Sequence, residues 1–245
     1  MVALLPSATA SGASMLRYST NPASDEPCPT ATIQGGRQIS NGRGGNVNRI
    51  DLTPYRFEAL IFDCDGTLVN TAPLHFRSLQ RAFASQGLEI SESWYRDRLG
   101  FSRKPLFEAF EREFDVTLDH EAAGVLSESI FASIVHEVQE TPVVASIARR
   151  HHGRMPMAVA SGGQRFLVEA TLKSCGLLDL FDAIVTVDDV PEGKPSPALF
   201  LEAANRLQTS PGLCLVFEDS DEGVEAAKRA NMTVIDVRSS VSDSE

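Results

Sequence analysis

The sequence lacks a long hydrophobic run. None of its apolar stretches approaches the roughly 18 residues that a membrane-spanning helix needs, although 42% of its 245 residues are hydrophobic. This length and composition are typical of a globular chain that can form one large domain or two modest ones. We therefore expect a folded protein that has no membrane partner.

Basic residues are also scarce. The chain contains 22 Lys and Arg against 33 Asp and Glu, which gives a net charge of −11. Four arginines and only two acidic residues lie among the first 50 residues, so the rest of the chain is more acidic than the total suggests. A chain this acidic is a poor partner for nucleic acid, whose phosphates attract clustered Lys and Arg. Any phosphate group that it binds must be small and must meet local cations.

Cysteines are few and widely spaced. The four of them, Cys28, Cys64, Cys175 and Cys214, lack the short paired spacing of a zinc site. Free thiols in a reducing compartment are the simpler interpretation.

The first 50 residues differ in composition from the rest. They are rich in Ser, Thr, Ala, Gly, Asn and Pro and show no lasting hydrophobic periodicity, so they cannot bury enough apolar surface to fold alone. The arginines, the many hydroxyl residues and the few acids are typical of an organelle transit peptide, and a plain disordered extension is the alternative. We predict a plastid or mitochondrial presequence over residues 1–50, and a cytoplasmic protein otherwise.

From residue 57 onward, short β-rich runs alternate with helical stretches. The expected strands are Leu60–Phe62, Met157–Ala160, Ala183–Val187, Leu213–Phe217 and Thr233–Val237, and the expected helices lie near 164–174, 197–207 and 221–230. This alternation predicts a parallel sheet covered by helices on both faces, which is a Rossmann-like three-layer α/β core. Such sheets bind ligands outside the carboxyl ends of their strands.

Residues 72–140 interrupt the alternation. Their apolar side chains recur at helical spacing, as in Leu74, Leu79 and Phe83, and no convincing strand is visible. We interpret this segment as an all-helical domain, called the cap below, inserted into the sheet domain. The predicted division is an extension of residues 1–50, a core of residues 51–71 and 141–245, and a cap of residues 72–140, with crossings near 70–72 and 139–142.

Two acidic residues, Asp63 and Asp65, follow the first expected strand. Residues two apart on an extended segment point the same way, so both carboxylates leave the strand end together. Gly66 permits a sharp turn after them, and Thr67 adds a hydroxyl group. Two carboxylates this close repel unless a cation lies between them or one holds a proton. The pattern indicates a magnesium site, a nucleophile with a partner acid, or both.

Three further polar motifs follow later strands. They are Ser161-Gly162-Gly163, Gly193-Lys194-Pro195 and Glu218-Asp219-Ser220. The first motif offers a hydroxyl and free backbone N–H groups to an anion. In the second motif, the stiff backbone around Lys194 directs its ammonium group toward the strand ends. Because the carboxyl ends of parallel strands meet at one edge of a sheet, we expect all four motifs to lie together.

Taken together, these motifs resemble those of the haloacid dehalogenase (HAD)-like superfamily of phosphotransferases. The matching residues are Asp63-Cys64-Asp65-Gly66-Thr67, Ser161, Lys194 before Pro195, and Glu218-Asp219-Ser220, within residues 57–238. The insertion point and the tract Val216-Phe217-Glu218-Asp219-Ser220, followed by Gly223 and Ala226-Ala227, are similar to the β-phosphoglucomutase and sugar-phosphate phosphatase branch.

The resemblance implies roles for the acidic residues. Asp63 would be the nucleophile that forms an aspartyl-phosphate, and Asp65 would protonate the leaving alcohol and later activate water. Mg²⁺ would bind Asp63, the backbone carbonyl of Asp65 and Asp219, with Glu218 acting through water. We expect Asp63 to stay ionised on the metal while Asp65 can hold a proton.

The resemblance also implies which groups bind the substrate, a small phosphorylated metabolite. Ser161, Gly162 and Thr67 would contact the transferring phosphoryl group, and Lys194 would neutralise its charge. In the cap, Arg103 resembles a phosphate-binding arginine of the phosphomutases and His75 matches an early cap histidine. A surface loop and a surface helix are the alternative interpretations of these two positions, and we expect a monomer.

Three functions stay open at this point. The first is a Mg²⁺-dependent phosphatase for a small phosphorylated metabolite, a sugar phosphate above all. The second is a β-phosphoglucomutase-like isomerase, which Arg103 and His75 favour. The third is a non-catalytic interaction protein that retains the fold, which predicts the loss of Asp63, Asp65, Lys194 or Asp219, and all four are present.

Overall fold

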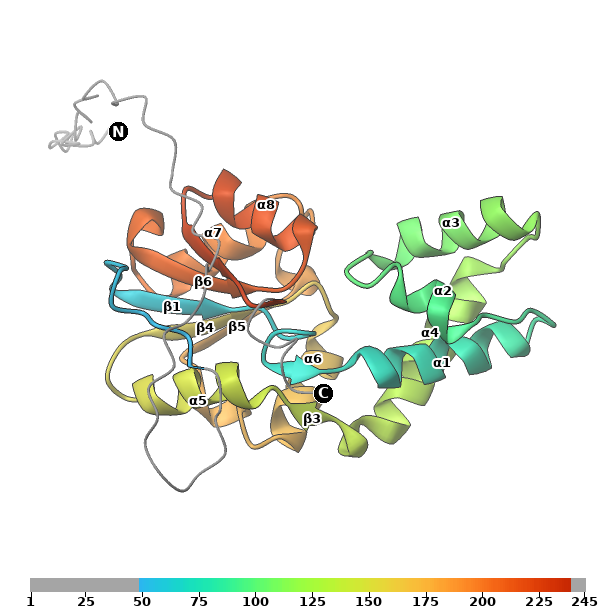
Figure 1. Ribbon diagram of the computed structural model, residues 1–245, viewed down its shortest axis with the longest axis horizontal. Coiled ribbons are helices and arrows are strands. Elements are labelled where there is room, and N and C mark those ends of the chain that lie inside the picture. Colours follow the sequence, from blue (N-terminus) through green and yellow to red (C-terminus); the bar gives the residue numbers. More distant parts are fainter. Residues whose placement is uncertain (1–48, 239–245) are drawn as a thin grey trace, which may run out of the picture.

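The computed structural model describes residues 49–238 and contains a parallel five-stranded sheet. The strand order is β5-β4-β1-β6-β7, and every neighbouring pair is parallel (Figure 1). The strands are β1 Ala59–Phe62, β4 Met157–Ala160, β5 Ala183–Val185, β6 Cys214–Glu218 and β7 Thr233–Asp236. The predicted three-layer α/β core is confirmed.

Helices cover both faces of this sheet (Figure 1). They are α5 Pro142–His151, α6 Arg165–Ser174, α7 Ala198–Arg206 and α8 Asp221–Arg229. Leu60 and Phe62 of β1 belong to the hydrophobic cluster that includes α5 and α6, whereas Ala59 and Ile61 belong to the cluster of α7 and α8. The central strand is therefore apolar at every position, because each of its sides meets a helical layer.

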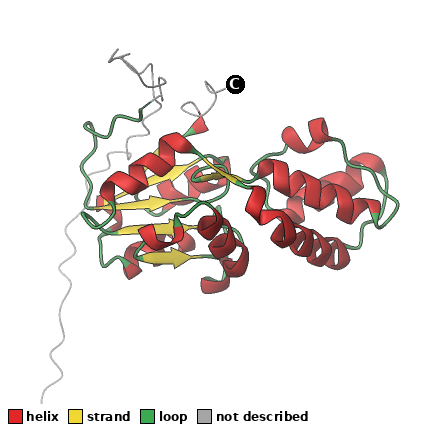
Figure 2. Ribbon diagram, turned by 90° about the horizontal axis from the view of Figure 1, so that it is seen from below, coloured by secondary structure: helices red, strands yellow, loops and turns green. Residues whose placement is uncertain are grey.

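A second group of helices lies beyond the carboxyl ends of the strands (Figure 2). It comprises α1 Ala72–Ala84, α2 Glu92–Arg96, α3 Arg103–Phe114 and α4 His120–Ile134. α1 packs along α4, and Trp94 and Phe110 lie in a hydrophobic cluster that these helices share. The helical character expected for this segment is present, while the division into separate domains stays a prediction.

Two short strands mark the crossings between the sheet and the cap. β2 Val69–Asn70 pairs antiparallel with β3 Gln139–Glu140, with Val69 opposite Glu140. The expectation of no strand in residues 72–140 is therefore wrong at its last two positions. Two residues are too few to give an alternating pattern that the sequence could reveal. Short 3₁₀ turns at Val135–Glu137, Leu178–Leu180, Val187–Asp189 and Pro211–Leu213 complete the connections.

The remaining predictions concern the presequence, the cysteines and the membrane. The transit peptide and Cys28 lie outside the described residues, whereas Cys64, Cys175 and Cys214 are free thiols. Within residues 49–238, no helix combines the length and the apolar character needed to cross a membrane.

Candidate active site

The loops that follow β1, β4, β5 and β6 meet at one edge of the sheet. Together with cap residues, they line a cavity of about 890 Å³. Asp63, Asp65, Lys194 and Asp219 line it from the core, and Arg103 lines it from the cap. The carboxyl edge of the sheet is where folds of this kind bind their ligands.

Lys194 lies between two carboxylates. Its Nζ donates hydrogen bonds to Asp63 Oδ1 and to Glu218 Oε2, both at 2.6 Å. The Lys194 side chain is only 9% exposed, so these buried charges compensate one another. Burial alone would lower the pKa of Lys194, but the charges of Asp63 and Glu218 outweigh it and raise that pKa. The ammonium group is therefore a fixed positive charge beside Asp63.

Glu218 is held by its own loop. Its Oε1 accepts hydrogen bonds from the Asp219 N–H, the Ser220 N–H and the Ser220 hydroxyl. Gly223 leaves the space that Glu218 occupies, since a Cβ there would lie 2.0 Å from the carboxyl carbon of Glu218. Both oxygens of Glu218 are engaged with protein donors, so this residue orients Lys194 in addition to any contact that it makes through water.

Three carboxylates form a cluster that fits a divalent cation. Asp63, Glu218 and Asp219 each place an oxygen within 4.8 Å of the others. Burial, followed by repulsion from Glu218, raises the pKa of Asp219 to about 7 and the pKa of Asp63 well above its usual range, and Lys194 offsets only part of this. Gly66 leaves room for the cluster, because a Cβ there would lie 2.0 Å from Asp219 Oδ2. Crowded carboxylate oxygens are the ligands that Mg²⁺ prefers.

Asp65 has a different environment from Asp63. His75 Nε2 lies 3.4 Å from Asp65 Oδ1, and the Ser161 hydroxyl donates to Asp65 Oδ2 at 3.3 Å. Burial would raise the pKa of Asp65, but the hydrogen bonds from His75, Thr71 and Ser161 outweigh it and lower that pKa. Without a cation, the pKa of Asp63 is raised and that of Asp65 is lowered, so the separation expected for Asp63 on Mg²⁺ stays a prediction. For Asp63, burial and the charge of Glu218 outweigh Lys194, whereas Asp65 accepts hydrogen bonds from several donors.

The position of Thr67 does not favour the substrate contact expected for this residue. It is fully buried, and its hydroxyl donates to Asp219 Oδ1 at 3.0 Å. It is not among the residues that line the cavity. The geometry favours a role for Thr67 in orienting Asp219 instead of a contact with the substrate.

Ser161 and Gly162 follow β4, and Ser161 is fully buried and is not among the residues that line the cavity. Gly162 lines the cavity, and a Cβ at this position would meet no atom within 4 Å. The Ser161 hydroxyl accepts a hydrogen bond from the Gly163 N–H at 3.0 Å and donates to Asp65. This hydroxyl therefore stabilises its own loop as well as the candidate acid, and the Gly163 N–H is already engaged.

His75 and Arg103 both line the cavity. The His75 ring stacks on Phe131, with 4.4 Å between the ring centroids, and this contact directs its Nε2 toward Asp65. Arg103 is ion-paired with Glu128 across the cap, at 2.5 Å. Both side chains have polar partners and remain partly exposed, at 38% for His75 and 47% for Arg103.

Two neighbours of the site were not predicted. Thr71, which donates to Asp65, precedes Ala72-Pro73 at the start of α1, and this cap signal could have drawn attention to it. Glu128 lies in the middle of α4 and carries no sequence signal that connects it with Arg103.

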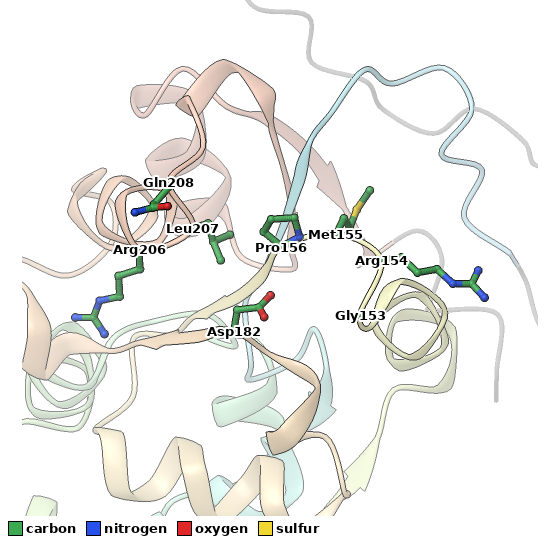
Figure 3. A pocket seen from close by; sticks show the side chains of 8 residues that line it. All are labelled: Gly153, Arg154, Met155, Pro156, Asp182, Arg206, Leu207 and Gln208. Carbon is green, nitrogen blue, oxygen red and sulfur yellow. The ribbon is translucent and has the colours of Figure 1, made fainter.

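A second cavity lies at the opposite edge of the sheet. Figure 3 shows its lining, which comprises Gly153, Arg154, Met155, Pro156, Asp182, Arg206, Leu207 and Gln208. Its volume is about 460 Å³. Asp182 accepts a hydrogen bond from the Met157 N–H at the beginning of β4, and Arg154 points away from Asp182. No candidate catalytic residue lines this cavity.

Comparison with known proteins agrees with this geometry. The family model described as haloacid dehalogenase-like hydrolase matches residues 60–237. The chain belongs to this family. Its region of similarity runs from β1 to the end of β7 and so includes every motif described above.

Several known proteins resemble the chain over about three quarters of its length. The fructose-1-phosphate phosphatase YqaB of Escherichia coli is 35% identical over 184 residues, which cover 75% of this chain and 97% of that protein. The solved structure of CbbY from Rhodobacter sphaeroides in complex with phosphate has a TM-score of 0.64 and 28% identity, covering 73% of this chain and 84% of that one. A putative β-phosphoglucomutase from Thermotoga maritima has a TM-score of 0.59 and 29% identity over the same shares of the two chains.

Proposed function

We propose that this HAD-like hydrolase is a Mg²⁺-dependent phosphatase that hydrolyses a small sugar phosphate through an aspartyl-phosphate on Asp63. The observation that carries the proposal is the Lys194 ammonium group, 2.6 Å from both Asp63 and Glu218, at the edge of the sheet that also holds Asp65 and Asp219. The similarity to a fructose-1-phosphate phosphatase supports a sugar phosphate as the substrate class.

In the first step, a carboxylate oxygen of Asp63 attacks phosphorus. A bond forms between Asp63 and phosphorus, the bond from phosphorus to the sugar oxygen breaks, and Asp65 gives its proton to that oxygen. Lys194 offsets negative charge on the transferring group, and the Ser161 hydroxyl, which donates to Asp65, keeps that acid in place. The alcohol leaves as a neutral molecule.

In the second step, water attacks phosphorus and Asp65 takes its proton. The bond between Asp63 and phosphorus breaks, inorganic phosphate leaves, and Asp65 is protonated again. Mg²⁺ held by Asp63, Asp219 and the backbone carbonyl of Asp65 would supply positive charge opposite the phosphate oxygens. Fixed charges of this kind lower the barrier because phosphoryl transfer depends on positioning and electrostatics.

The lowered pKa of Asp65 in the free protein is compatible with an acid role. A bound phosphate dianion beside Asp65 disfavours its ionisation and raises its pKa. Asp65 would thus take up its proton from solvent when the substrate binds, while His75 and Thr71 keep the carboxyl group in place.

A β-phosphoglucomutase-like isomerase is the second candidate. It is favoured by the positions of His75 and Arg103 on the cavity wall and by the structural similarity to the Thermotoga protein. It would use the same first step and then return the phosphoryl group to a sugar. A protein without catalysis would not need the buried Lys194 pair, which is costly to maintain unless it has a use.

A screen for phosphate release tests the proposal. Sugar phosphates and nucleotides are incubated with the protein and Mg²⁺, and glucose 1-phosphate is assayed in parallel for isomerisation after priming with glucose 1,6-bisphosphate. We expect release from at least one sugar phosphate and no isomerisation. Isomerisation without net release would favour the mutase, and the absence of both reactions would exclude both enzymes.

A further inference from the structure

Arg103 and Glu128 form an ion pair at the cap end of the cavity. Arg103 begins α3 and lines the cavity, whereas Glu128 lies on α4 outside the lining. Arg103 Nη2 is 2.5 Å from Glu128 Oε1, and the Glu128 side chain is 15% exposed against 47% for Arg103. The carboxylate thus lies behind the guanidinium group as seen from the cavity.

Gly124 leaves room for the Arg103 side chain, because glycine has no Cβ. A Cβ at Gly124 would lie 3.2 Å from Arg103 Nη1 and 3.7 Å from its Cδ. Glycine inside a helix costs about 1 kcal/mol relative to alanine, and Gly124 stands within the 15-residue helix α4. Residues four apart share a helix face, so Gly124 and Glu128 together form the surface on which Arg103 rests.

The pairing changes what Arg103 can recognise. A guanidinium group beside a mostly buried carboxylate keeps its N–H donors, but it presents little net positive charge. Such a group suits hydroxyl oxygens better than a second phosphate, which would have to approach Glu128 against electrostatic repulsion.

The remaining arginines of the cavity wall are also paired. Arg98 Nη2 is 2.6 Å from Glu113, and Arg238 is 2.5 Å from Asp236 and 2.8 Å from Asp221. Among the residues that the structure describes, each arginine lining the cavity therefore has a carboxylate partner. The fixed cation that faces the reaction is Lys194, at the core end.

We propose that the Arg103–Glu128 pair recognises the uncharged, hydroxyl-bearing end of a sugar monophosphate, and that Glu128 selects against a second phosphate. This inference rests on the proposed phosphatase function and narrows its substrate class. It also disfavours isomerisation through a sugar bisphosphate, because that intermediate would place its second phosphate against the pair.

The test compares ligands that differ by one phosphate group. p-Nitrophenyl phosphate serves as the substrate, and fructose 1-phosphate with fructose 1,6-bisphosphate and glucose 1-phosphate with glucose 1,6-bisphosphate serve as competitive inhibitors. We expect the wild-type protein to bind the monophosphate more tightly in at least one pair. Glu128→Gln should shift the ratio of inhibition constants toward the bisphosphate about tenfold, the effect of removing one opposing charge.

Two further variants separate this effect from loss of structure. Glu121→Gln removes an exposed acid from the first turn of the same helix and should leave the ratio unchanged. Gly124→Ala should shift the Arg103 side chain by a few tenths of an ångström and weaken monophosphate inhibition about two- to threefold, without lowering the melting temperature, because alanine favours the helix.

The outcomes separate failure of the proposed substrate selection from failure of the proposed phosphatase function. No hydrolysis of p-nitrophenyl phosphate by the wild-type protein would overturn the proposed phosphatase and this inference with it. Hydrolysis with an unchanged ratio in Glu128→Gln, no inhibition by any of the sugars, or a wild-type preference for the bisphosphates would overturn the inference alone.

Discussion

At the scale of single residues, Gly66 sets the space for the metal-binding carboxylates. Its φ is +87°, and a Cβ would lie 2.0 Å from Asp219 Oδ2. We predict that Gly66→Ala displaces Asp219 and weakens Mg²⁺ binding at least tenfold, as the loss of one carboxylate contact implies. The Mg²⁺ concentration that gives half-maximal phosphate release measures this.

Gly87→Ala is the matched control for that variant. Gly87 has a φ of +75°, so alanine is strained there to a similar degree, but a Cβ at Gly87 meets nothing within 4 Å. Each substitution should cost about 1 kcal/mol of stability from backbone strain. Equal Mg²⁺ requirements in the two variants would show that Gly66 has no part in placing Asp219.

Lys194 offers a second test at this scale. Lys194→Met leaves Asp63 and Glu218 as buried carboxylates without their cation. We predict loss of phosphate release and a free energy of unfolding lower by about 3–5 kcal/mol, measured by urea denaturation without metal at neutral pH.

The exposed cap lysine provides the comparison. Lys104 is 81% exposed and only 3.8 Å from Glu108, so Lys104→Met should change the free energy of unfolding by less than about 0.5 kcal/mol. A Lys194→Met protein with an unchanged urea midpoint would mean that the ion pairs are not formed in solution.

At the scale of elements, the start of α8 positions Glu218, the second carboxylate that pairs with Lys194. Ser220 caps this helix by accepting a hydrogen bond from the Gly223 N–H, and it also donates to Glu218. We predict that Gly223→Ala forces Glu218 away from Lys194 and lowers both the melting temperature and kcat. Thermal unfolding monitored by circular dichroism, together with the phosphatase assay, measures the two effects.

Lys228→Ala, exposed near the end of the same helix, should change neither quantity appreciably. If Gly223→Ala behaves like Lys228→Ala, then the close packing of α8 on Glu218 does not matter for the site.

The sequence was sufficient to predict which elements carry the site. The first strand and its Asp63-Cys64-Asp65-Gly66 turn could be predicted because a short apolar run, a period of two and a glycine are local signals. The five strands of the parallel sheet begin and end within two residues of the predicted positions, whereas β2 and β3 were not predicted.

The partners of the site residues could not be predicted in the same way. The contact between Thr67 and Asp219 joins residues 152 positions apart, and that between Arg103 and Glu128 joins two helices whose packing the sequence does not specify. The opposite pKa shifts of Asp63 and Asp65 depend on burial and on donors from the start of α1 and from the loop after β4. Such properties arise only after the chain has packed.

At the scale of the whole molecule, the acidic cluster links stability to pH and metal. The pKa of Asp219 is about 7 in the folded protein without metal, against the usual 3.8. Between these two pH values, the folded protein therefore holds a proton that the unfolded chain releases. The stabilisation from that proton is complete below about pH 4 and is lost as the pH rises through 7.

Mg²⁺ must compete with this proton, so we predict a larger stabilisation by MgCl₂ at pH 8 than at pH 6. At one hundred times the dissociation constant, binding adds about 2.7 kcal/mol, which corresponds to about 5–10 °C in Tm. Thermal unfolding with MgCl₂ or EDTA measures the shift, and Asp219→Asn should reduce it. A larger shift at pH 6, or none at pH 8, would contradict the assignment of the cluster as a metal site.

The central claim is that Asp63 is the nucleophile of a phosphatase, and phosphate release by Asp63→Asn tests it most directly. The variant keeps the size of the side chain, and its folding is checked by thermal unfolding. We predict that the rate of release from the best sugar phosphate falls by a factor of at least about 10⁴, because an amide oxygen is a poor nucleophile toward phosphorus. A folded Asp63→Asn protein that releases phosphate at a rate near that of the wild type would contradict the account.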